Sequence, residues 1–266
     1  MIIIFYAEGD YFIKRLITYL KNCRRLFSNK LLHVVSMSAR NIIGKQSLVG
    51  DKPIISNHYF TFVKLLEENW NSIYDELIEI LKYRDLIPSF HEISKEQYKI
   101  SKGRKWKTFA FFSFGHKFKY NCAYAPNTAK LLECIPNLQS AWFSVIAPGY
   151  HIPKHKGITR GILRGHLGLS IPISSKECFM DIGDSRIYWE QGKVVVFDDT
   201  FEHEVWNNTD QERIVLLFDF DRPMKNIGRY IHDTSMKIFR QTAAYKQGVK
   251  STIEIEKLFN RKVAIR

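Results

Sequence analysis

The second half of the chain shows a pattern of short apolar runs that is typical of β-strands. β-Branched and aromatic residues fill these runs, and Gly, Pro, Asn and Asp separate them, as they do at turns. The runs lie at residues 140–147, 161–172, 178–182, 193–198 and 212–220. Several short strands with no helix between them predict an antiparallel sandwich or barrel of jelly-roll type.

Helical patterns precede and follow the predicted strands. The segment 59–83 predicts one or two long amphipathic helices, because its apolar residues recur at three- and four-residue steps. A short helix is expected at 127–134, with Asn127 as its N-cap. Helical spacing returns at 230–245 and 253–258. The expected fold class is therefore mainly β with flanking helices.

Near the N-terminus, residues 10–27 form a further amphipathic pattern, in which Lys and Arg accompany the apolar positions. A basic amphipathic helix can lie on an anionic membrane surface. It can equally dock on its own domain. The sequence leaves both alternatives open.

Charge divides the chain into three parts. Residues 1–50 carry 8 Lys/Arg against 2 Asp/Glu, and residues 224–266 carry 10 against 3. The two ends thus account for the whole net charge of +13, and residues 51–223 are neutral. We therefore expect a basic N-terminal segment (1–50), a self-contained domain (51–223) and a basic helical tail (224–266), whose charged ends contact an anionic partner such as a membrane surface.

The composition excludes several classes of protein. A hydrophobic content of 45% in 266 residues supports a full core, and an aromatic share of 14% disfavours disorder. The four cysteines show no zinc-finger or disulfide spacing, and no stretch reaches the roughly 20 apolar residues of a membrane span. No nucleic-acid motif is visible, which makes nucleic acid an unfavoured partner. We expect a cytoplasmic protein, soluble or peripheral at the inner face of the membrane.

Two histidines, His155 and His203, are candidate metal ligands in the β region. Paired imidazoles suit Fe, Zn, Cu or Ni. The commonest non-haem iron site adds a carboxylate two residues after the first His, but that position here is Gly157. The spacing alone therefore does not indicate a metal site.

The run 162–170 alternates in character. Leu163, Leu167 and Leu169 point to one face of a strand, and Arg164 and His166 point to the other. If the leucines face the helices, Arg164 and His166 face the interior of the roll and need an anionic partner. The alternative is that this polar face is simply the solvated side of an antiparallel sheet.

The turn at 207–209 sits between two predicted strands. A three-residue loop there would place His203 opposite Arg213 across a hairpin, with both side chains on one face. A loop with an even number of residues and no bulge would place them on opposite faces. A cosubstrate with two carboxylates, 2-oxoglutarate, would explain this set. Arg213 suits its far carboxylate, because guanidinium binds carboxylates in bidentate fashion. Arg164 and His166 suit the near end, and the two histidines leave open iron positions.

Residues 140–223 resemble the aspartyl/asparaginyl β-hydroxylase family of Fe(II)/2-oxoglutarate-dependent oxygenases. The matching stretches are PGYHIPKHKG (148–157), LRGHLGLSIP (163–172), WEQGKVVVFDDTFEHEVWN (189–207), RIVLLFD (213–219) and DRP (221–223). The resemblance implies a double-stranded β-helix, of jelly-roll or cupin-like type. It also implies catalysis by iron with 2-oxoglutarate and O2 as cosubstrates.

The resemblance assigns roles by position. His155 and His203 match the iron-binding, catalytic histidines. The family lacks the carboxylate ligand, so Gly157 agrees with it, and water would take that place. The cosubstrate-binding residues implied are Ser144 and Arg213 at the distal carboxylate, and Arg164 and His166 near the metal-bound end.

The substrate stays open at this point. The chain lacks the transmembrane anchor and helical-repeat domain of eukaryotic members, and is similar in size to compact bacterial members, some of which hydroxylate an acyl chain of lipid A. An anionic glycolipid, another acyl chain and an Asp/Asn side chain of a peptide are all candidates. Glu202, Glu204 and Trp206 either line the pocket mouth or alternate on an edge strand. A different class also remains: a catalytically silent jelly-roll module that binds a membrane through its basic ends.

Overall fold

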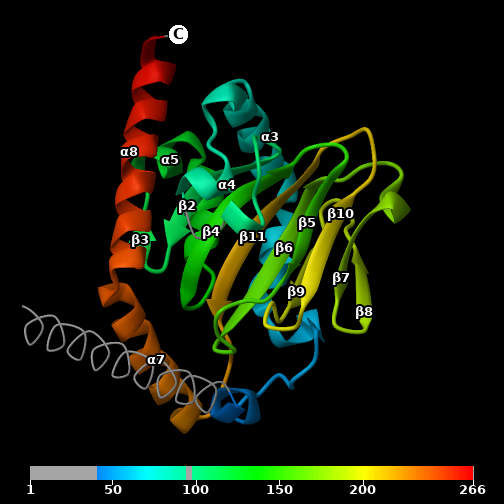
Figure 1. The fold of residues 1–266 in the computed structure, drawn as a ribbon, viewed down its shortest axis with the longest axis vertical. Helices are drawn as coiled ribbons and strands as arrows, with labels where there is room; N and C mark the ends of the chain where they lie inside the picture. The colour runs from blue at the N-terminus through cyan, green and yellow to red at the C-terminus, as the bar shows by residue number, and fades with distance from the viewer. Residues whose placement is uncertain (1–40, 94–97, 266) are drawn as a thin grey trace, which may run out of the picture. The chain divides into compact units, whose positions relative to one another are not determined.

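Two antiparallel sheets form the centre of the fold (Figure 1). The computed structural model describes residues 41–93 and 98–265, and the helix expected at 10–27 lies outside them. The larger sheet has the order β1 (Ile54–Ile55), β9 (Val194–Phe197), β6 (Ile162–Ser170), β11 (Arg213–Asp221), β4 (Leu138–Ile146), β2 (Trp106–Ser113) and β3 (His116–Lys117). The smaller sheet has the order β5 (Tyr150–His155), β10 (His203–Asn207), β7 (Cys178–Ile182) and β8 (Ser185–Tyr188).

The chain moves back and forth between the two sheets. It passes from β4 in the larger sheet to β5 in the smaller, returns to β6, crosses to β7 and β8, and then visits β9, β10 and β11 in the same alternating way. All paired strands are antiparallel. This winding is that of a double-stranded β-helix, so the predicted jelly-roll core is confirmed.

The five predicted strands correspond to β4, β6, β7, β9 and β11. The pattern did not reveal β1, β2, β3, β5 or β8 as strands, whereas β10 is the strand expected before the turn at 207–209. β5 contains Pro153 and alternates charged with apolar residues, and β8 is only four residues long. Short strands that mix charged and apolar residues show only weak alternation in the sequence, so their pairing with neighbouring strands in the structure is what shows them to be strands.

Five helices pack buried apolar residues against one face of the larger sheet: α2 (Thr61–Glu68), α3 (Trp70–Leu81), α5 (Lys119–Tyr124), α6 (Pro126–Glu133) and α8 (Ala243–Ile265). The described ranges also contain α4 (Phe90–Ile93), α7 (Asn226–Gln241) and 3-10 turns at Asn57–Tyr59, Arg84–Leu86 and Ser175–Glu177. The segment 59–83 therefore contains two helices, as one of the predicted alternatives had it. The predicted cap of α6 was wrong. The helix begins one residue earlier, and Glu76 of α3 accepts the backbone N–H groups of Asn127 and Thr128, both at 2.8 Å.

Two apolar clusters hold the layers together. Leu163, Leu167 and Leu169 are fully buried in the cluster between the larger sheet and the helices, which confirms the predicted orientation of β6. The second cluster fills the space between the two sheets, where Leu217 of β11 packs with Val205 of β10. Because side chains alternate along a strand, the residues between these leucines on β6 must point into the second space.

The C-terminal helices belong to the same compact unit as the sheets, residues 43–266. Glu256 of α8 accepts the backbone N–H groups of Tyr120 and Asn121 at 2.6 and 3.1 Å, and Phe259 is buried against Phe109. The boundary expected at residue 223 thus marks a change in charge and in secondary structure within one unit. None of the helices in the described ranges combines the length and the apolar character needed to cross a bilayer.

Candidate active site

The structure brings His155 and His203 together between the sheets. His155 ends β5 and His203 begins β10, and the two residues are paired directly across these neighbouring strands. Their ring centroids lie 4.1 Å apart. Because β10 also presents Val205 to the space between the sheets, His203 two residues earlier faces the same interior.

Both imidazoles are held in the same tautomer. The Nδ1 atom of His155 lies 2.9 Å from the carbonyl oxygen of Pro153, and Nδ1 of His203 lies 2.9 Å from that of Phe201. A carbonyl only accepts, so each Nδ1 carries a proton and each Nε2 keeps a free lone pair. Burial lowers the pKa of both rings, that of His203 to about 3. Neutral imidazoles with available Nε2 atoms are the form that binds a metal.

Asp199 fills the space beside Gly157. A Cβ atom at position 157 would collide with the Asp199 carboxylate, and the backbone N–H of Gly157 donates to the Asp199 carbonyl at 2.6 Å. Burial raises the pKa of Asp199 to about 6, while Arg164 opposes this shift. The chain therefore places a carboxylate next to His155 from the loop before β10, in the space where a side chain two residues after His155 would lie.

Arg164 points into the interior, on the side expected from the alternation of β6. Its guanidinium forms a bidentate pair with Asp219, at 2.7 and 3.0 Å, and its Nη1 lies 3.2 Å from Asp199. The anionic partner that a buried arginine needs is thus supplied by two carboxylates of the chain itself. Arg164 connects β6, β11 and the loop before β10 into one rigid corner.

Arg213 is buried without such a partner. Its side chain is 2% exposed, and its Nε and Nη1 atoms have no hydrogen-bond partner within the described ranges. The guanidinium lies over the ring of Trp189, 4.5 Å from the centroid. Burial lowers its pKa to about 10, so it remains a cation at neutral pH. A buried, unpaired cation costs several kcal/mol, and an incoming anion would remove this cost.

Two further donors accompany Arg213. Nδ1 of buried His166 accepts a hydrogen bond from Nε1 of Trp189 at 3.1 Å, so the His166 proton is on Nε2, which has no partner among the described residues. Burial lowers the pKa of His166, which keeps it neutral. Ser144 accepts from the indole of Trp106 at 3.0 Å, which leaves its own hydroxyl proton free to donate. These donors and Arg213 could bind an anion with two ends.

Sequence reasoning missed Trp189 as a functional residue. Its ring supports the guanidinium of Arg213, and its N–H group selects the tautomer of His166. Its signal in the sequence was its place in the stretch 189–207 that resembles the family, since nothing in the periodicity separates a buried Trp from any other core residue. Only the tertiary structure shows that Trp189 contacts Arg213 and His166.

The predicted hairpin between His203 and Arg213 was wrong. β10 pairs with β5 and β7 in the smaller sheet, and β11 pairs with β4 and β6 in the larger. The intervening turn crosses between the sheets, and the Asn207 side chain ties it by donating to the carbonyls of Ala147 and Gln211, at 3.1 and 2.9 Å. His203 and Arg213 therefore reach the common interior from opposite sheets.

A groove of about 510 Å³ opens beside His203, at the β7–β8 turn and the loop before β10. The charged lining of this groove consists of Lys154, Asp181, Asp184, Arg186, Glu202 and Glu204. Glu204 alternates along β10 with the inward-facing His203 and Val205, so it points to the outer face of the smaller sheet. A place for Glu202 and Glu204 at the mouth of the active site stays a prediction. Trp206 stacks on His151, with 3.5 Å between ring centroids.

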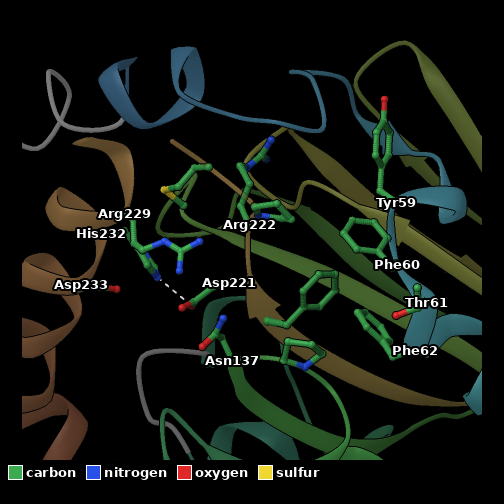
Figure 2. A pocket seen from close by; sticks show the side chains of 14 residues that line it. Tyr59, Phe60, Thr61, Phe62, Asn137, Asp221, Arg222, Arg229, His232 and Asp233 are labelled. Atoms are coloured by element: carbon green, nitrogen blue, oxygen red, sulfur yellow. Dashed lines mark hydrogen bonds and ion pairs between the residues drawn. The ribbon is translucent and has the colours of Figure 1, made fainter. Parts of the chain in front are cut away.

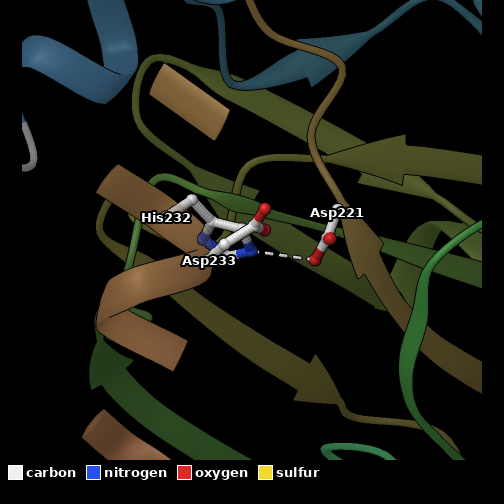
Figure 3. Close-up of side chains that lie close together, drawn as sticks. All are labelled: Asp221, His232 and Asp233. Atoms are coloured by element: carbon white, nitrogen blue, oxygen red, sulfur yellow. Dashed lines mark hydrogen bonds and ion pairs between the residues drawn. The ribbon is translucent and has the colours of Figure 1, made fainter. Parts of the chain in front are cut away.

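A second cluster of potential metal ligands lies at the end of β11 and on α7 (Figure 2). Nε2 of His232 lies 2.9 Å from Asp221, and Asp233 is close by (Figure 3). Asp233 is exposed, Asp221 already accepts from Gln139 at 2.6 Å, and Arg229 lines the same pocket of about 250 Å³. With one imidazole and a neighbouring cation, this cluster is a poorer metal site than the pair His155 and His203.

Comparisons with known proteins agree with this geometry. The sequence profile described as aspartyl/asparaginyl beta-hydroxylase matches residues 67–223. The ornithine lipid ester-linked acyl 2-hydroxylase of Rhizobium tropici is 35% identical over 215 residues, which cover 81% of this chain and 76% of that protein. The aspartyl/asparaginyl beta-hydroxylase of Homo sapiens is also 35% identical, over 62% of this chain but only 22% of the human protein.

Among solved structures, the viral collagen prolyl hydroxylase of Paramecium bursaria Chlorella virus-1 is 12% identical, with a TM-score of 0.31 over 44% of this chain and 79% of that one. The family assignment rests on the sequence comparisons instead. The profile matches more than half of the chain, and the rhizobial relative is covered over three quarters of its length. The chain therefore belongs to the aspartyl/asparaginyl β-hydroxylase family, a family of hydroxylases.

Proposed function

We propose that this hydroxylase depends on Fe(II) and 2-oxoglutarate and inserts one oxygen atom into an unactivated C–H bond. One observation carries the proposal: the buried guanidinium of Arg213 has no anionic partner among the described residues, and it faces the same interior as two neutral imidazoles whose Nε2 lone pairs can bind a metal. A cosubstrate that binds a metal at one end and carries a carboxylate at the other satisfies both needs at once.

The residues fit these groups by their chemistry. His155 and His203 would hold the iron through Nε2, and imidazole nitrogens suit that metal. Arg213 and the hydroxyl of Ser144 would hold the distal carboxylate of 2-oxoglutarate, because charge-assisted hydrogen bonds from guanidinium are strong and directional. The Nε2–H group of His166 would donate to an oxygen of the same molecule. Gly157 offers no ligand and the Asp199 carboxylate lies beside it, so water next to Asp199 would complete the ligands of the metal.

When bound, iron and 2-oxoglutarate supply the oxidising power, as O2 and 2-oxoglutarate yield succinate, CO2 and a hydroxylated substrate. The chain orients the metal ligands and the cosubstrate, and it excludes water from the space between the sheets. Trp106, Trp142 and Trp189 are buried between the sheets and exclude water from the interior. The pairs of Arg164 with Asp219 and Asp199 fix the loop that precedes His203, so that both imidazoles keep their positions.

For the substrate we propose a lipid acyl chain. The rhizobial relative, which is covered over most of its length, is named for acyl hydroxylation of a lipid, whereas the human relative is matched over about a fifth of its length. Helix α7 supports contact with a membrane surface. It exposes Ile227, Tyr230 and Ile238 beside lysines and arginines, and such a face suits an anionic bilayer.

The test measures conversion of 2-oxoglutarate to succinate by purified protein with iron and ascorbate. The wild type is expected to form succinate, and His155→Ala and His203→Ala are expected to abolish it. His58→Ala is the matched control, because His58 is exposed and its hydrogen-bond partner in the described part of the chain is its near neighbour Ser56. Wild-type turnover that survives both substitutions would end the proposal. A silent binding module would instead bind no iron and show no thermal stabilisation by N-oxalylglycine.

A further inference from the structure

Trp142 of β4 carries a buried hydrogen-bond donor that has no acceptor. Its side chain is 9% exposed and packs in the cluster between the two sheets, on the same face of β4 as Ser144. Its indole Nε1 is closed off from solvent and has no hydrogen-bond partner among the described residues. A buried N–H group without a partner destabilises the protein, and a ligand that supplies an acceptor would remove this cost.

The other two tryptophans of this cluster are different. Nε1 of Trp106 donates to Ser144 at 3.0 Å, and Nε1 of Trp189 donates to His166 at 3.1 Å. Each of these N–H groups is therefore satisfied by the side chain that it orients. An indole N–H is a donor only, so Trp142 needs an acceptor from outside the described residues.

Two contacts hold the indole of Trp142 in place. The ring of Phe90 stacks on it, with 5.9 Å between centroids and 25° between planes, and the guanidinium of Arg164 lies over it, 5.7 Å from the centroid. Arg164 in turn lies 3.2 Å from Asp199, whose carboxylate fills the space beside Gly157. The ring therefore reaches towards the end of the interior that contains the two imidazoles.

The donors proposed for the far carboxylate of 2-oxoglutarate lie towards the other end. Trp142 pairs with Leu217 on β11, and Arg213 is four residues earlier on that strand, which is about 13 Å at about 3.3 Å per residue. Arg164 pairs with Asp219, two residues beyond Leu217 in the opposite direction. The indole thus lies on the side of the interior where the reacting C–H bond of a substrate must meet the metal.

An uncharged donor at this place suits an uncharged acceptor. The neighbouring charge of Arg164 is already balanced by Asp219 and Asp199. A carbonyl oxygen of an ester or amide is a neutral acceptor with two lone pairs, whereas a chain of CH2 groups accepts no hydrogen bond. The N–H of Trp142 therefore favours a carbonyl compound over a plain hydrocarbon chain, which would leave it buried and unpaired.

We propose that Nε1–H of Trp142 donates a hydrogen bond to a carbonyl oxygen of the substrate, and so places the carbon next to that carbonyl at the metal. The inference rests on the proposed function and deepens it by naming the substrate class: an ester or amide of a carboxylic acid that enters the interior with its carbonyl end. For an acyl lipid, the hydroxylated carbon then lies near the carbonyl and far from the methyl end of the chain.

The experiment compares two lipids that differ at one carbonyl. An ornithine lipid, and the same lipid with its ester-linked acyl chain replaced by an ether-linked alkyl chain, are offered in neutral detergent micelles to full-length protein with iron, ascorbate and 2-oxoglutarate. Consumption of each lipid is followed by mass spectrometry, and kcat/KM is obtained for each. The wild type is expected to prefer the ester about tenfold, because the ether leaves the indole N–H without an acceptor.

A variant then tests whether Trp142 is the source of this preference. Trp142→Phe keeps an aromatic ring and removes the N–H, so the ratio of kcat/KM between ester and ether should fall about tenfold. The intrinsic reactivity of the two lipids cancels when the ratios of variant and wild type are compared. KM for 2-oxoglutarate should stay unchanged. Trp70→Phe on α3, outside the interior, is the matched control and should change neither quantity.

A spectroscopic measurement on the wild type does not depend on turnover. Each of the five tryptophans gives one indole signal in the proton–nitrogen NMR spectrum, and single Trp→Phe variants identify these signals. Zinc and N-oxalylglycine replace iron and 2-oxoglutarate, since zinc has no redox chemistry. The ester lipid should shift the Trp142 signal downfield as its proton enters a hydrogen bond, and the ether lipid should not.

The two proposals fail in different ways. A ratio of ester to ether that Trp142→Phe leaves unchanged would overturn the carbonyl contact and leave the proposed function standing. A rise in KM for 2-oxoglutarate without a change in that ratio would overturn it as well, because the N–H would then serve the cosubstrate. Succinate formation without consumption of the ester lipid has the same consequence. Absence of any succinate from the wild type would overturn the proposed function, and the carbonyl contact with it.

Discussion

Two arginines at opposite ends of β11 are equally buried and differently paired. Arg222, just after the strand, is 2% exposed and pairs with Asp198, while its Nε donates to the Arg160 carbonyl at 2.7 Å and its Nη1 to the Gly50 carbonyl at 3.0 Å. Arg213, at the start of the strand, is also 2% exposed and has no carboxylate partner in the part of the chain that the structure describes.

This difference in pairing suggests different roles: Arg222 stabilises the fold, and Arg213 is available to bind an anion. A buried cation with a full set of partners stabilises the arrangement in which those partners meet. A buried cation without them destabilises the unliganded protein, and this is tolerated where binding later supplies the anion. The contrast between Arg222 and Arg213 therefore supports a dicarboxylate site at the Arg213 end of the interior.

The sharpest way to break this comparison is to remove Arg222. Arg222→Met would leave the Asp198 carboxylate buried beside a hydrophobic side chain, so the free energy of unfolding should fall by about 3–5 kcal/mol. Denaturant unfolding of the metal-free protein measures this. The double variant with Asp198→Asn should recover part of the loss. Arg213→Met should cost little or increase stability, and an equal loss in both single variants would contradict the comparison.

The same substitution at Arg213 should remove cosubstrate binding. Without the guanidinium, affinity for 2-oxoglutarate is expected to fall about 100-fold, since charge-assisted hydrogen bonds are lost. Titration calorimetry with N-oxalylglycine on iron-loaded protein measures the affinity. Arg213→Lys should recover only part of it, because an ammonium cannot bind in bidentate fashion. Unchanged affinity in Arg213→Met would remove the assignment of this residue.

A buried histidine, like a buried arginine, affects the stability of the fold, and in this case the effect depends on pH. Burial lowers the pKa of His203 from 6.5 to about 3, so between these values the unfolded chain binds a proton that the folded protein does not. The stability of metal-free protein should therefore be fully present above about pH 6.5. It should fall as the pH drops towards 3, by on the order of 1 kcal/mol per pH unit. Unfolding midpoints at pH 7 and 5 measure the slope, which His203→Asn should reduce and His58→Asn should not.

The smallest effect is expected at Trp189. Trp189→Phe keeps an aromatic ring under Arg213 but removes the N–H that donates to His166, a loss of about 1 kcal/mol. Affinity for 2-oxoglutarate should fall about fivefold, measured as before by calorimetry with N-oxalylglycine. Trp70→Phe on α3, away from the interior, should leave the affinity as it is. A fall as large as that of Arg213→Met would mean that Trp189 positions the whole site.

The jelly-roll core and the inward side of β6 could be predicted from sequence because they depend on local patterns. Alternation along 162–170 assigns Leu163 to one face and Arg164 to the other without knowledge of neighbouring strands. The resemblance also selected His155 and His203 by position, and the fold brings them together. These features repeat within a few residues or follow from ordered motifs, so they can be read along the chain.

Sheet membership and pairing were decided only by the tertiary structure. The turn after β10 gives no local sign that it crosses to the other sheet, which is why a hairpin joining His203 to Arg213 was a reasonable and wrong prediction. The sequence likewise cannot show that Arg164 meets Asp219 while Arg213 meets no carboxylate, since those distances depend on the register of strands far apart in the chain. The sequence determines that arginines occupy positions 164 and 213. The packing of the strands determines which of the two has a carboxylate partner and which is left to bind a ligand.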